Sequence, residues 1–188
     1  MKKIGFDFDG VIADTDKIKK EYFNSQNIQI KNFNKSDIFN ELESIYSSEY
    51  ILQIYRKMSE YVFREETIKR TYPVEGAIES IKKLAKQFEI YIITARNYVQ
   101  LVLVKEWLKM YDINNEIKAI ISSSEEKKHK LRICKENNIA FFCDDDIRHL
   151  SYENSDNIVK ILFNNNKLLK NYNIHSVESW KDLLKYIR

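Results

Sequence analysis

The amino-acid sequence predicts an α/β fold, a Rossmann-like three-layer arrangement around a parallel sheet with an inserted small helical cap. Short apolar runs alternate with amphipathic helical stretches through the second half of the chain, which is typical of a mostly parallel sheet with helices on both faces. A stretch of different character precedes the chain's only proline, Pro73, and Gly76. With 188 residues the chain is long enough for one core and one inserted subdomain, and too short for two full domains.

The first half of the chain begins with a strand and continues into the insertion. Residues 4–8 alternate apolar and other side chains before the turn at Gly10, which predicts a strand. In residues 15–70 apolar side chains recur at near-helical spacing, so this stretch is predicted to be mostly helical. Residues 24–40 within it are rich in Asn and Lys and are predicted to be loop with short pieces of structure. The predicted division is a core of residues 1–14 and 72–188 and a cap of residues 15–71.

Strands and helices alternate after the boundary at Pro73. Ile78, Ile81 and Leu84 form the apolar face of an amphipathic helix. The predicted strands that follow are the apolar runs at residues 89–94, 117–121, 139–143 and 158–163. The predicted helices cover residues 98–111, 123–138 and 176–187, the second of them opened by a Ser123-x-x-Glu126 capping box. Ligands of such sheets bind at the carboxyl ends of the strands, so the polar residues found there are the candidates for function.

The composition excludes several classes of protein. Hydrophobic residues make up 44% and charged residues 31% of the chain, which excludes a disordered or low-complexity protein. The net charge of +3 is of mixed sign without a long basic run, so we expect no nucleic acid polymer as a partner. No apolar stretch approaches the roughly 20 residues that span a bilayer, and acidic residues follow the N-terminus closely, so we expect a cytoplasmic protein with no membrane partner. Cys134 and Cys143 are expected to be buried, reduced thiols.

Two aspartates stand at the end of the first predicted strand, in Asp7-Phe8-Asp9-Gly10. Side chains two apart on a strand point the same way, so both carboxylates are expected on one side of the turn. Their repulsion raises one pKa unless a cation intervenes, and this is how a site holds an ionised nucleophile beside a proton-carrying acid. An Asp-rich turn is the alternative. A calcium loop of the EF-hand type is excluded, because it needs an oxygen ligand in place of Val11 and a glycine in place of Ile12.

A second acidic cluster, Asp144-Asp145-Asp146, follows the apolar run at residues 139–143. Three acids at the end of a buried strand are costly without a metal or basic partners. Hard oxygen ligands of this kind suit Mg²⁺, which takes one or two carboxylates and leaves positions for phosphate oxygens and water. A helix cap formed by Asp146 accounts for that residue alone and not for all three.

A hydroxyl and a group of lysines complete the candidates. Thr94 ends a predicted strand and precedes a helix, where it either contacts a phosphate or caps the helix. Lys127, Lys128 and Lys130 lie in the first turns of the helix predicted at 123–138. Lysine is unfavourable near a helix start, which indicates that an anion holds one of the three, whereas a solvated face accounts for the others.

These segments, in this order, resemble the four motifs of the haloacid dehalogenase (HAD) superfamily of phosphatases. The matching segments are FDFDGVIADT at residues 6–15, IITAR at 92–96, a lysine in the following helix, and FCDD at 142–145. The resemblance covers the chain from end to end, including the cap. More narrowly, Thr94-Ala95-Arg96 with Trp107-Leu108, and KLRIC at residues 130–134 running into Asp144-Asp145, resemble the bacterial branch related to 5'(3')-deoxyribonucleotidases.

The resemblance implies a magnesium-dependent hydrolysis of phosphomonoesters. By this resemblance, Asp7 would be the nucleophile that forms an aspartyl-phosphate. Asp9 would protonate the leaving alkoxide and then activate water. Thr94 would hydrogen-bond the phosphoryl group and Lys130, chosen among the three lysines by its distance to Asp144, would neutralise it. The implied substrate-binding set is Thr94, Ala95, Arg96 and Lys130, and the implied metal ligands are Asp7, the Asp9 carbonyl, Asp144 and, close behind, Asp145.

The implied substrate is a small phosphorylated metabolite, in the narrower resemblance a nucleoside or deoxynucleoside monophosphate, with a monomer and a homodimer both open. A phosphatase for another metabolite is the alternative. A receiver-like signalling module is disfavoured, because its phosphorylated aspartate lies on a middle strand of the sequence order, and a dehalogenase does not need Asp9 as an acid. Aromatic residues of the cap either stack on a base or pack its core; they are Phe23, Phe33, Phe39, Tyr46, Tyr50 and Tyr55.

Overall fold

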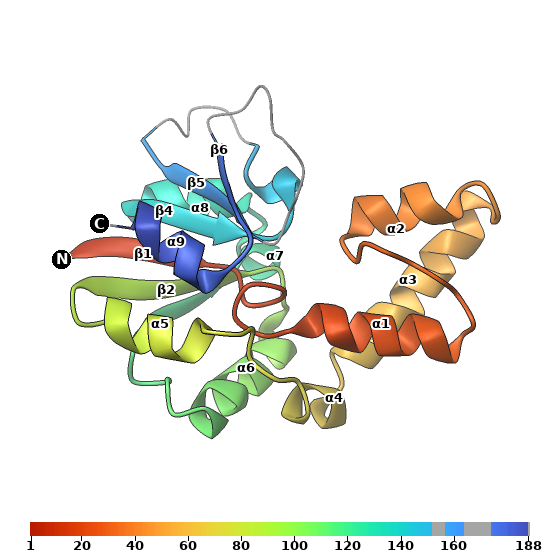
Figure 1. Cartoon of the computed structure of the whole chain (residues 1–188), viewed down its shortest axis with the longest axis horizontal. Helices are drawn as coiled ribbons and strands as arrows, with labels where there is room; N and C mark the ends of the chain where they lie inside the picture. Colours follow the sequence, from red (N-terminus) through yellow and green to blue (C-terminus); the bar gives the residue numbers. More distant parts are fainter. Residues whose placement is uncertain (152–156, 164–173, 188) are drawn as a thin grey trace. The chain divides into compact units, whose positions relative to one another are not determined.

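The computed structural model describes residues 1–151, 157–163 and 174–187 (Figure 1). The chain divides into two compact units. The core unit consists of Met1–Ala13 and Pro73–Arg188, and the inserted unit of Asp14–Tyr72.

In its described residues, the core unit is built on a six-stranded sheet whose neighbouring strands are all parallel. The strand order is β3-β2-β1-β4-β5-β6. The strands are β1 (Lys2–Phe6), β2 (Phe88–Thr94), β3 (Ile117–Ser122), β4 (Ile139–Asp144), β5 (Val159–Phe163) and β6 (Ile174–Val177). The prediction of a parallel α/β sheet is confirmed. The chain fills the sheet on one side of β1 and then on the other, so the carboxyl ends of β1, β2 and β4 meet at a topological switch point.

Helices cover both faces of this sheet. The helices of the core unit are α5 (Ala77–Leu84), α6 (Tyr98–Met110), α7 (Ser123–Glu126), α8 (Lys130–Glu136) and α9 (Trp180–Tyr186). Ile93, Leu131 and Phe142 belong to one buried cluster, which places α8 on that face. Phe6 points to the opposite face, where its ring lies 4.9 Å from that of Trp180 at the start of α9. Both faces are therefore buried, which explains the nearly continuous apolar runs of the strands.

The predicted helix over residues 123–138 is wrong, because two helices occupy this stretch. Lys127 follows α7 in the left-handed conformation, with φ of 50°, and the helix cannot continue through it. His129 then caps α8 by accepting a hydrogen bond from the Leu131 amide. The predicted capping box is also displaced, since Ser122 caps α7 by accepting from the Glu125 amide.

The predicted helix at residues 176–187 begins too early. β6 pairs with β5 over Ile174–Val177, and α9 starts only at Trp180, after Ser179 has capped it. The first strand also differs: it covers Lys2–Phe6 instead of residues 4–8. Asp7 and Asp9 consequently lie in the loop after β1.

The inserted unit is helical, with α1 (Thr15–Ser25), α2 (Lys35–Leu42), α3 (Ser48–Val62) and α4 (Glu65–Lys69). Helix α3 packs against α1 and α2 around a core of its own, to which Phe23, Ile38 and Met58 belong. Helix α2 overlaps the stretch at residues 24–40 that is predicted to be loop with short pieces of structure. The helix begins there because Asn34, one of the Asn residues behind that prediction, caps it by accepting from the Asp37 amide. Among the aromatic residues of the insertion Phe23 is buried, whereas Tyr50 is about half exposed.

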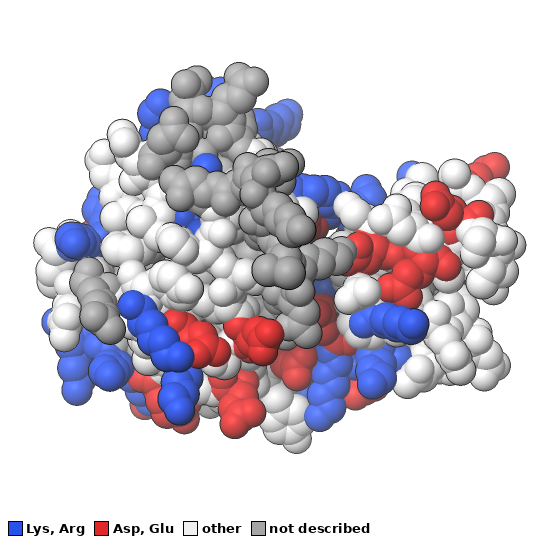
Figure 2. Space-filling model, turned by 45° about the horizontal axis from the view of Figure 1, so that its top comes forward, with Lys and Arg blue, Asp and Glu red and all other residues white. Residues whose placement is uncertain are grey.

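The structure also bears on the expectations for the cysteines, the surface charges and membrane-spanning helices. Cys134 and Cys143 are free and buried, as predicted, and burial raises the pKa of both thiols. Basic and acidic side chains are interspersed on the face drawn in Figure 2. In the part of the chain that the structure describes, no helix is long and apolar enough to cross a membrane.

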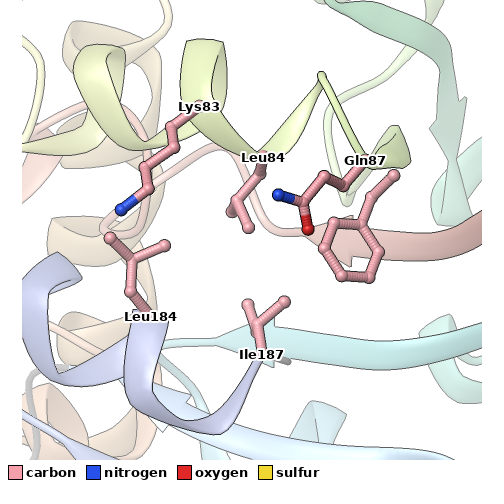
Figure 3. Close-up of a pocket in the computed structure, with 6 residues that line it drawn as sticks. Lys83, Leu84, Gln87, Leu184 and Ile187 are labelled. Carbon is pink, nitrogen blue, oxygen red and sulfur yellow. The ribbon is translucent and has the colours of Figure 1, made fainter.

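A pocket lies between α5 and α9 (Figure 3). Its wall includes Leu84 and Gln87 on one side and Leu184 and Ile187 on the other. Phe88, which also lines it, opens β2, whereas Thr94 closes that strand. A strand of this length spans about 20 Å, so the pocket is remote from the carboxyl ends where the candidate residues lie.

We expect Trp180 to hold the loop after β1 in place. Its indole N–H donates to the Val11 carbonyl at 2.8 Å, and its side chain is buried. Trp180→Ala should lower the free energy of unfolding by about 3 to 5 kcal/mol, measured by urea denaturation. Trp180→Phe keeps most of the packing and leaves the Val11 carbonyl without its donor, so it should cost about 1 to 3 kcal/mol. Equal stability of Trp180→Ala and the wild type would contradict this.

Candidate active site

The loop after β1 carries the two aspartates in a tight turn. The Asp7 amide donates to the Cys143 carbonyl at 2.8 Å, which carries the pairing of β1 with β4 one residue further. The amides of Ile12 and Ala13 both donate to the Phe8 carbonyl, and Gly10 adopts φ of 75°. A Cβ atom at Gly10 would overlap the carboxylate of Asp145, so the close approach of these two segments requires glycine.

Lys130 connects Asp7 with Asp144. Its Nζ lies 2.7 Å from Asp7 Oδ2 and 2.8 Å from Asp144 Oδ2, and the side chain is 1% exposed. Lys130 opens α8, so the break after α7 is what brings it to the carboxyl ends of the strands. Lys128 instead pairs with Glu126 and Glu136 at the surface, and Lys127 is exposed. Of the three candidate lysines, Lys130 is the one beside the carboxylates.

Asp144 is fully buried and has a partner on each oxygen. Oδ2 accepts from Lys130, and Oδ1 accepts from the Asp146 amide at 2.9 Å and lies 3.1 Å from His149 Nδ1. The sequence interpretation did not include His149. The signal available was its position five residues after Asp144, in a short turn that opens with three acids. Asp146 caps this turn by accepting from the Arg148 amide, as its alternative interpretation predicted.

The buried charges shift one another's pKa. Burial raises the pKa of Asp7 to about 6, although Lys130 opposes the shift. Burial also acts to raise the pKa of Asp144, but Lys130 and His149 outweigh it and hold that pKa below its ordinary value. Burial would lower the pKa of Lys130, and the two carboxylates raise it instead. The cluster thus keeps Asp144 and Lys130 ionised, while Asp7 is the group whose ionisation is costly.

The donor set of this cluster suits a cation. Ligand atoms of Asp7, Asp144 and His149 lie within 4.8 Å of one another. Buried carboxylate oxygens are the hard ligands that Mg²⁺ takes, and two of them are present. Asp145 lies outside this group of three, with its carboxylate against Gly10. A divalent cation beside Asp7 would also offset the charge that burial disfavours.

Thr94, Ala95 and Arg96 form a loop whose backbone is held by three successive serines. Hydroxyl groups of these serines donate to each carbonyl of the loop: Ser123 to Thr94, Ser124 to Ala95 and Ser122 to Arg96. The Thr94 hydroxyl, which is buried, accepts from the Arg96 amide at 3.2 Å. The sequence interpretation missed the serines, whose only signal was three hydroxyl residues in a row at a strand end.

The Arg96 side chain lies on Asp9. Its Nε donates to Asp9 Oδ2 at 3.0 Å and its Nη2 to Asp9 Oδ1 at 2.8 Å. Asp7 and Asp9, predicted to face one side of a turn, therefore have different partners, Lys130 and Arg96. The predicted residues converge at the carboxyl ends of β1, β2 and β4, where the chain brings together the carboxylates of Asp7 and Asp144, a buried lysine and the Asp9–Arg96 pair.

Comparisons with known proteins point to one family. The family model described as "5' nucleotidase, deoxy (Pyrimidine), cytosolic type C protein" matches residues 1–188. A haloacid dehalogenase-like hydrolase from Streptococcus pneumoniae is 15% identical with a TM-score of 0.69, over 100% of this chain and 99% of that one. A predicted phosphatase from Clostridium acetobutylicum is 18% identical with a TM-score of 0.66, over 99% and 97%. A HAD-hydrolase from Bacillus subtilis, bound to magnesium, is 16% identical with a TM-score of 0.63, over 99% and 98%. No curated protein matches the sequence.

We expect Asp7→Asn to stabilise the protein in the absence of metal. The pKa of Asp7 is about 6 in the folded chain against an ordinary 3.8, so the folded state binds more protons between these values. Stability from this group is therefore lost as the pH rises from about 4 to about 6, and ionised Asp7 costs roughly 3 kcal/mol above that range. The neutral amide removes this cost. The melting temperature at pH 7.5 should rise by about 2 to 4 °C for each kcal/mol regained.

The comparison is made by thermal denaturation in chelator at pH 7.5 and pH 5. The gain should shrink at pH 5, where Asp7 of the wild type is largely protonated. Asp16→Asn makes the same chemical change at the partly exposed Asp16–Lys19 pair and should raise the melting temperature at neither pH. A gain that is as large at pH 5 as at pH 7.5 would show that the charge of Asp7 is not its cause.

Proposed function

Because this chain belongs to the family described as 5' nucleotidase, deoxy (pyrimidine), cytosolic type C protein, we propose that it hydrolyses nucleoside or deoxynucleoside monophosphates through an aspartyl-phosphate on Asp7, with Mg²⁺ as cofactor. The chain is a phosphatase of the 5'-nucleotidase type within the HAD superfamily. The observation that carries the proposed mechanism is the buried contact of Lys130 with both Asp7 and Asp144.

In the first step Asp7 attacks the phosphorus of the substrate. A bond forms between the Asp7 oxygen and phosphorus, the bond from phosphorus to the ester oxygen breaks, and the leaving oxygen takes a proton from Asp9. In the second step a water molecule attacks the same phosphorus and gives a proton to Asp9. The bond between phosphorus and Asp7 then breaks, which releases inorganic phosphate and restores the carboxylate.

The remaining residues bind the phosphoryl group. Lys130 offers a buried positive charge, and the proposed substrate contacts extend to Thr94 and Ala95. Asp7, the Asp9 carbonyl and Asp144 would hold Mg²⁺, with Asp145 close behind. When bound, the ion supplies positive charge that stabilises the phosphoryl oxygens as the transition state develops.

Substrate choice is proposed to come from the inserted unit, acting as a cap. The groups named above meet only the phosphoryl group, which every monoester shares, so discrimination requires residues that reach the remainder of the substrate. The family description favours a nucleotide over other phosphorylated metabolites. Its word "cytosolic" also supports the expected cytoplasmic location.

We expect Asp7→Asn to abolish phosphate release, because an amide is not a nucleophile. The loss should be on the order of 10³-fold or more in kcat, as when other catalytic nucleophiles are removed. The measurement is release of inorganic phosphate from a panel of nucleoside and deoxynucleoside monophosphates, sugar phosphates and phosphoglycolate. Asp16→Asn serves as the matched control and should keep full activity.

Two outcomes would count against the proposal. Activity of Asp7→Asn within tenfold of the wild type would refute the aspartyl-phosphate mechanism. A sugar phosphate or phosphoglycolate with the highest kcat/KM would refute the nucleotide substrate and leave the phosphatase chemistry standing.

We expect activity to depend on Mg²⁺ and to be inhibited by Ca²⁺. Mg²⁺ ligands lie at about 2.0 to 2.1 Å, whereas Ca²⁺ ligands lie at about 2.3 to 2.6 Å, so Ca²⁺ would misplace the reacting oxygen. Mg²⁺ affinity should rise with pH up to about 6 and level off above it, because Asp7 must lose its proton to bind the ion. Titration calorimetry between pH 5 and 8 tests the affinity. Full activity in excess chelator would contradict the metal requirement.

A further inference from the structure

We propose that Arg96 is a positioning residue that acts through Asp9. Its guanidinium fixes the carboxylate of Asp9 where that carboxylate exchanges a proton with the leaving oxygen. The inference rests on the proposed function, in which Asp9 is the acid of the first step. It assigns Arg96 a task different from the substrate contact that the sequence resemblance implies.

The contact has the geometry of a strong ion pair. Two nearly parallel N–H groups of Arg96 donate to the two oxygens of Asp9, at 3.0 Å and 2.8 Å. Asp9 keeps 20% of its side chain exposed, whereas that of Arg96 is 1% exposed. The guanidinium carbon also lies 5.1 Å from the centre of the Phe8 ring. The side chain of Arg96 is thus almost completely buried, whereas the carboxylate of Asp9 that it contacts still reaches solvent.

The backbone of Arg96 is anchored as well. Its amide donates to the Thr94 hydroxyl, and its carbonyl accepts from Ser122 at 2.6 Å. The preceding carbonyls of the loop accept from Ser123 and Ser124. Both Nε and Nη2 of Arg96 donate to Asp9, so these two groups are not directed at a substrate. The fixed backbone therefore serves the contact with Asp9. Because its backbone is fixed in this way, Arg96 can hold the carboxylate of Asp9 in one position.

Positioning matters because Asp9 lies in a loop and its carboxylate turns about two side-chain bonds. Proton transfer requires a heavy-atom distance of about 2.6 to 3.2 Å, so a turned carboxylate is inactive. The ion pair does not block the transfer. Each carboxylate oxygen has two lone pairs, so Asp9 can carry or accept a proton while both contacts with Arg96 persist.

The leaving group separates this role from substrate binding. An alkoxide leaving from a nucleotide needs the proton of Asp9, whereas acetate leaving from acetyl phosphate does not. If Arg96 acts through Asp9, its loss harms the nucleotide and spares acetyl phosphate. If Arg96 binds the phosphoryl group, its loss harms both. The parameter to compare is kcat/KM, which reports the reaction up to loss of the leaving group and excludes the later hydrolysis step.

The experiment is a double-mutant cycle with Arg96→Met, Asp9→Asn and the double variant, in Mg²⁺, on a deoxynucleoside monophosphate and on acetyl phosphate. Arg96→Met should lower kcat/KM for the nucleotide by about 10- to 10³-fold, part of the 10²- to 10⁴-fold typical of a general acid. For acetyl phosphate we expect a change of less than about threefold. In the Asp9→Asn background the same substitution should have no further effect on the nucleotide, because the group it acts through is already lost.

Two further variants guard the test against misfolding. Arg96→Lys keeps the charge and loses the double contact, so it should restore part of the nucleotide activity. Ser122→Ala loosens the anchor of Arg96 and should reproduce the selective loss on the nucleotide at about 2- to 10-fold, also where Arg96→Met fails to fold.

Equal losses on the two substrates, or an additive loss in the double variant, would overturn the role of Arg96. Asp7→Asn is measured alongside and should be inactive on both substrates. If it is inactive and Arg96→Met is unselective, the proposed function stands and this inference fails. If Asp7→Asn is active, both fail.

Discussion

The candidate site depends on one lysine that is buried between two carboxylates. Lys130 lies within 2.8 Å of Asp7 and of Asp144, and all three side chains are almost closed to solvent. Removal of Lys130 would leave two buried carboxylates without their shared cation, and breaking a buried ion pair in this way typically costs about 3 to 5 kcal/mol. The three groups come from the loop after β1, the end of β4 and the first turn of α8. Their contact therefore fixes the relative position of these elements. Because α8 begins at Lys130, directly after the break that follows α7, its first side chain reaches both carboxylates.

Elements decided by local pattern could be predicted from the sequence. The strands β2 to β5 follow from their apolar runs, because a parallel strand covered on both faces must be apolar throughout. The helix predicted over residues 123–138 is wrong because the helical pattern passes through Lys127, and the pattern does not show that this residue takes the left-handed conformation. β6 was missed because Ile-His-Ser-Val shows no clear alternation and is held by its pairing with β5. Such pairing is a tertiary contact, which a local pattern does not contain.

The partners of the site residues lie beyond local pattern for the same reason. The sequence could place acids, a hydroxyl and lysines at the carboxyl ends of the strands, because these residues directly follow the predicted strands or open the next helix. It could not decide that Arg96 meets Asp9, which is 87 residues away. Nor could it find the three serines that hold the Thr94 loop, because a serine at a strand end is common and its task depends on which loop lies opposite.

The hydrogen bond from Trp180 to the Val11 carbonyl has a consequence for how the molecule is made. It joins residues 169 positions apart, and the first strand likewise waits for both of its sheet neighbours, which come much later in the chain. Contacts between such distant positions form slowly, and a chain that grows from its N-terminus exposes β1 before its partners exist. The loop with Asp7 and Asp9 is synthesised before β2, β4 and Trp180, on which its position depends. Until Trp180 has left the ribosome, the loop that carries the candidate nucleophile therefore lacks the hydrogen bond that the Val11 carbonyl accepts in the folded protein.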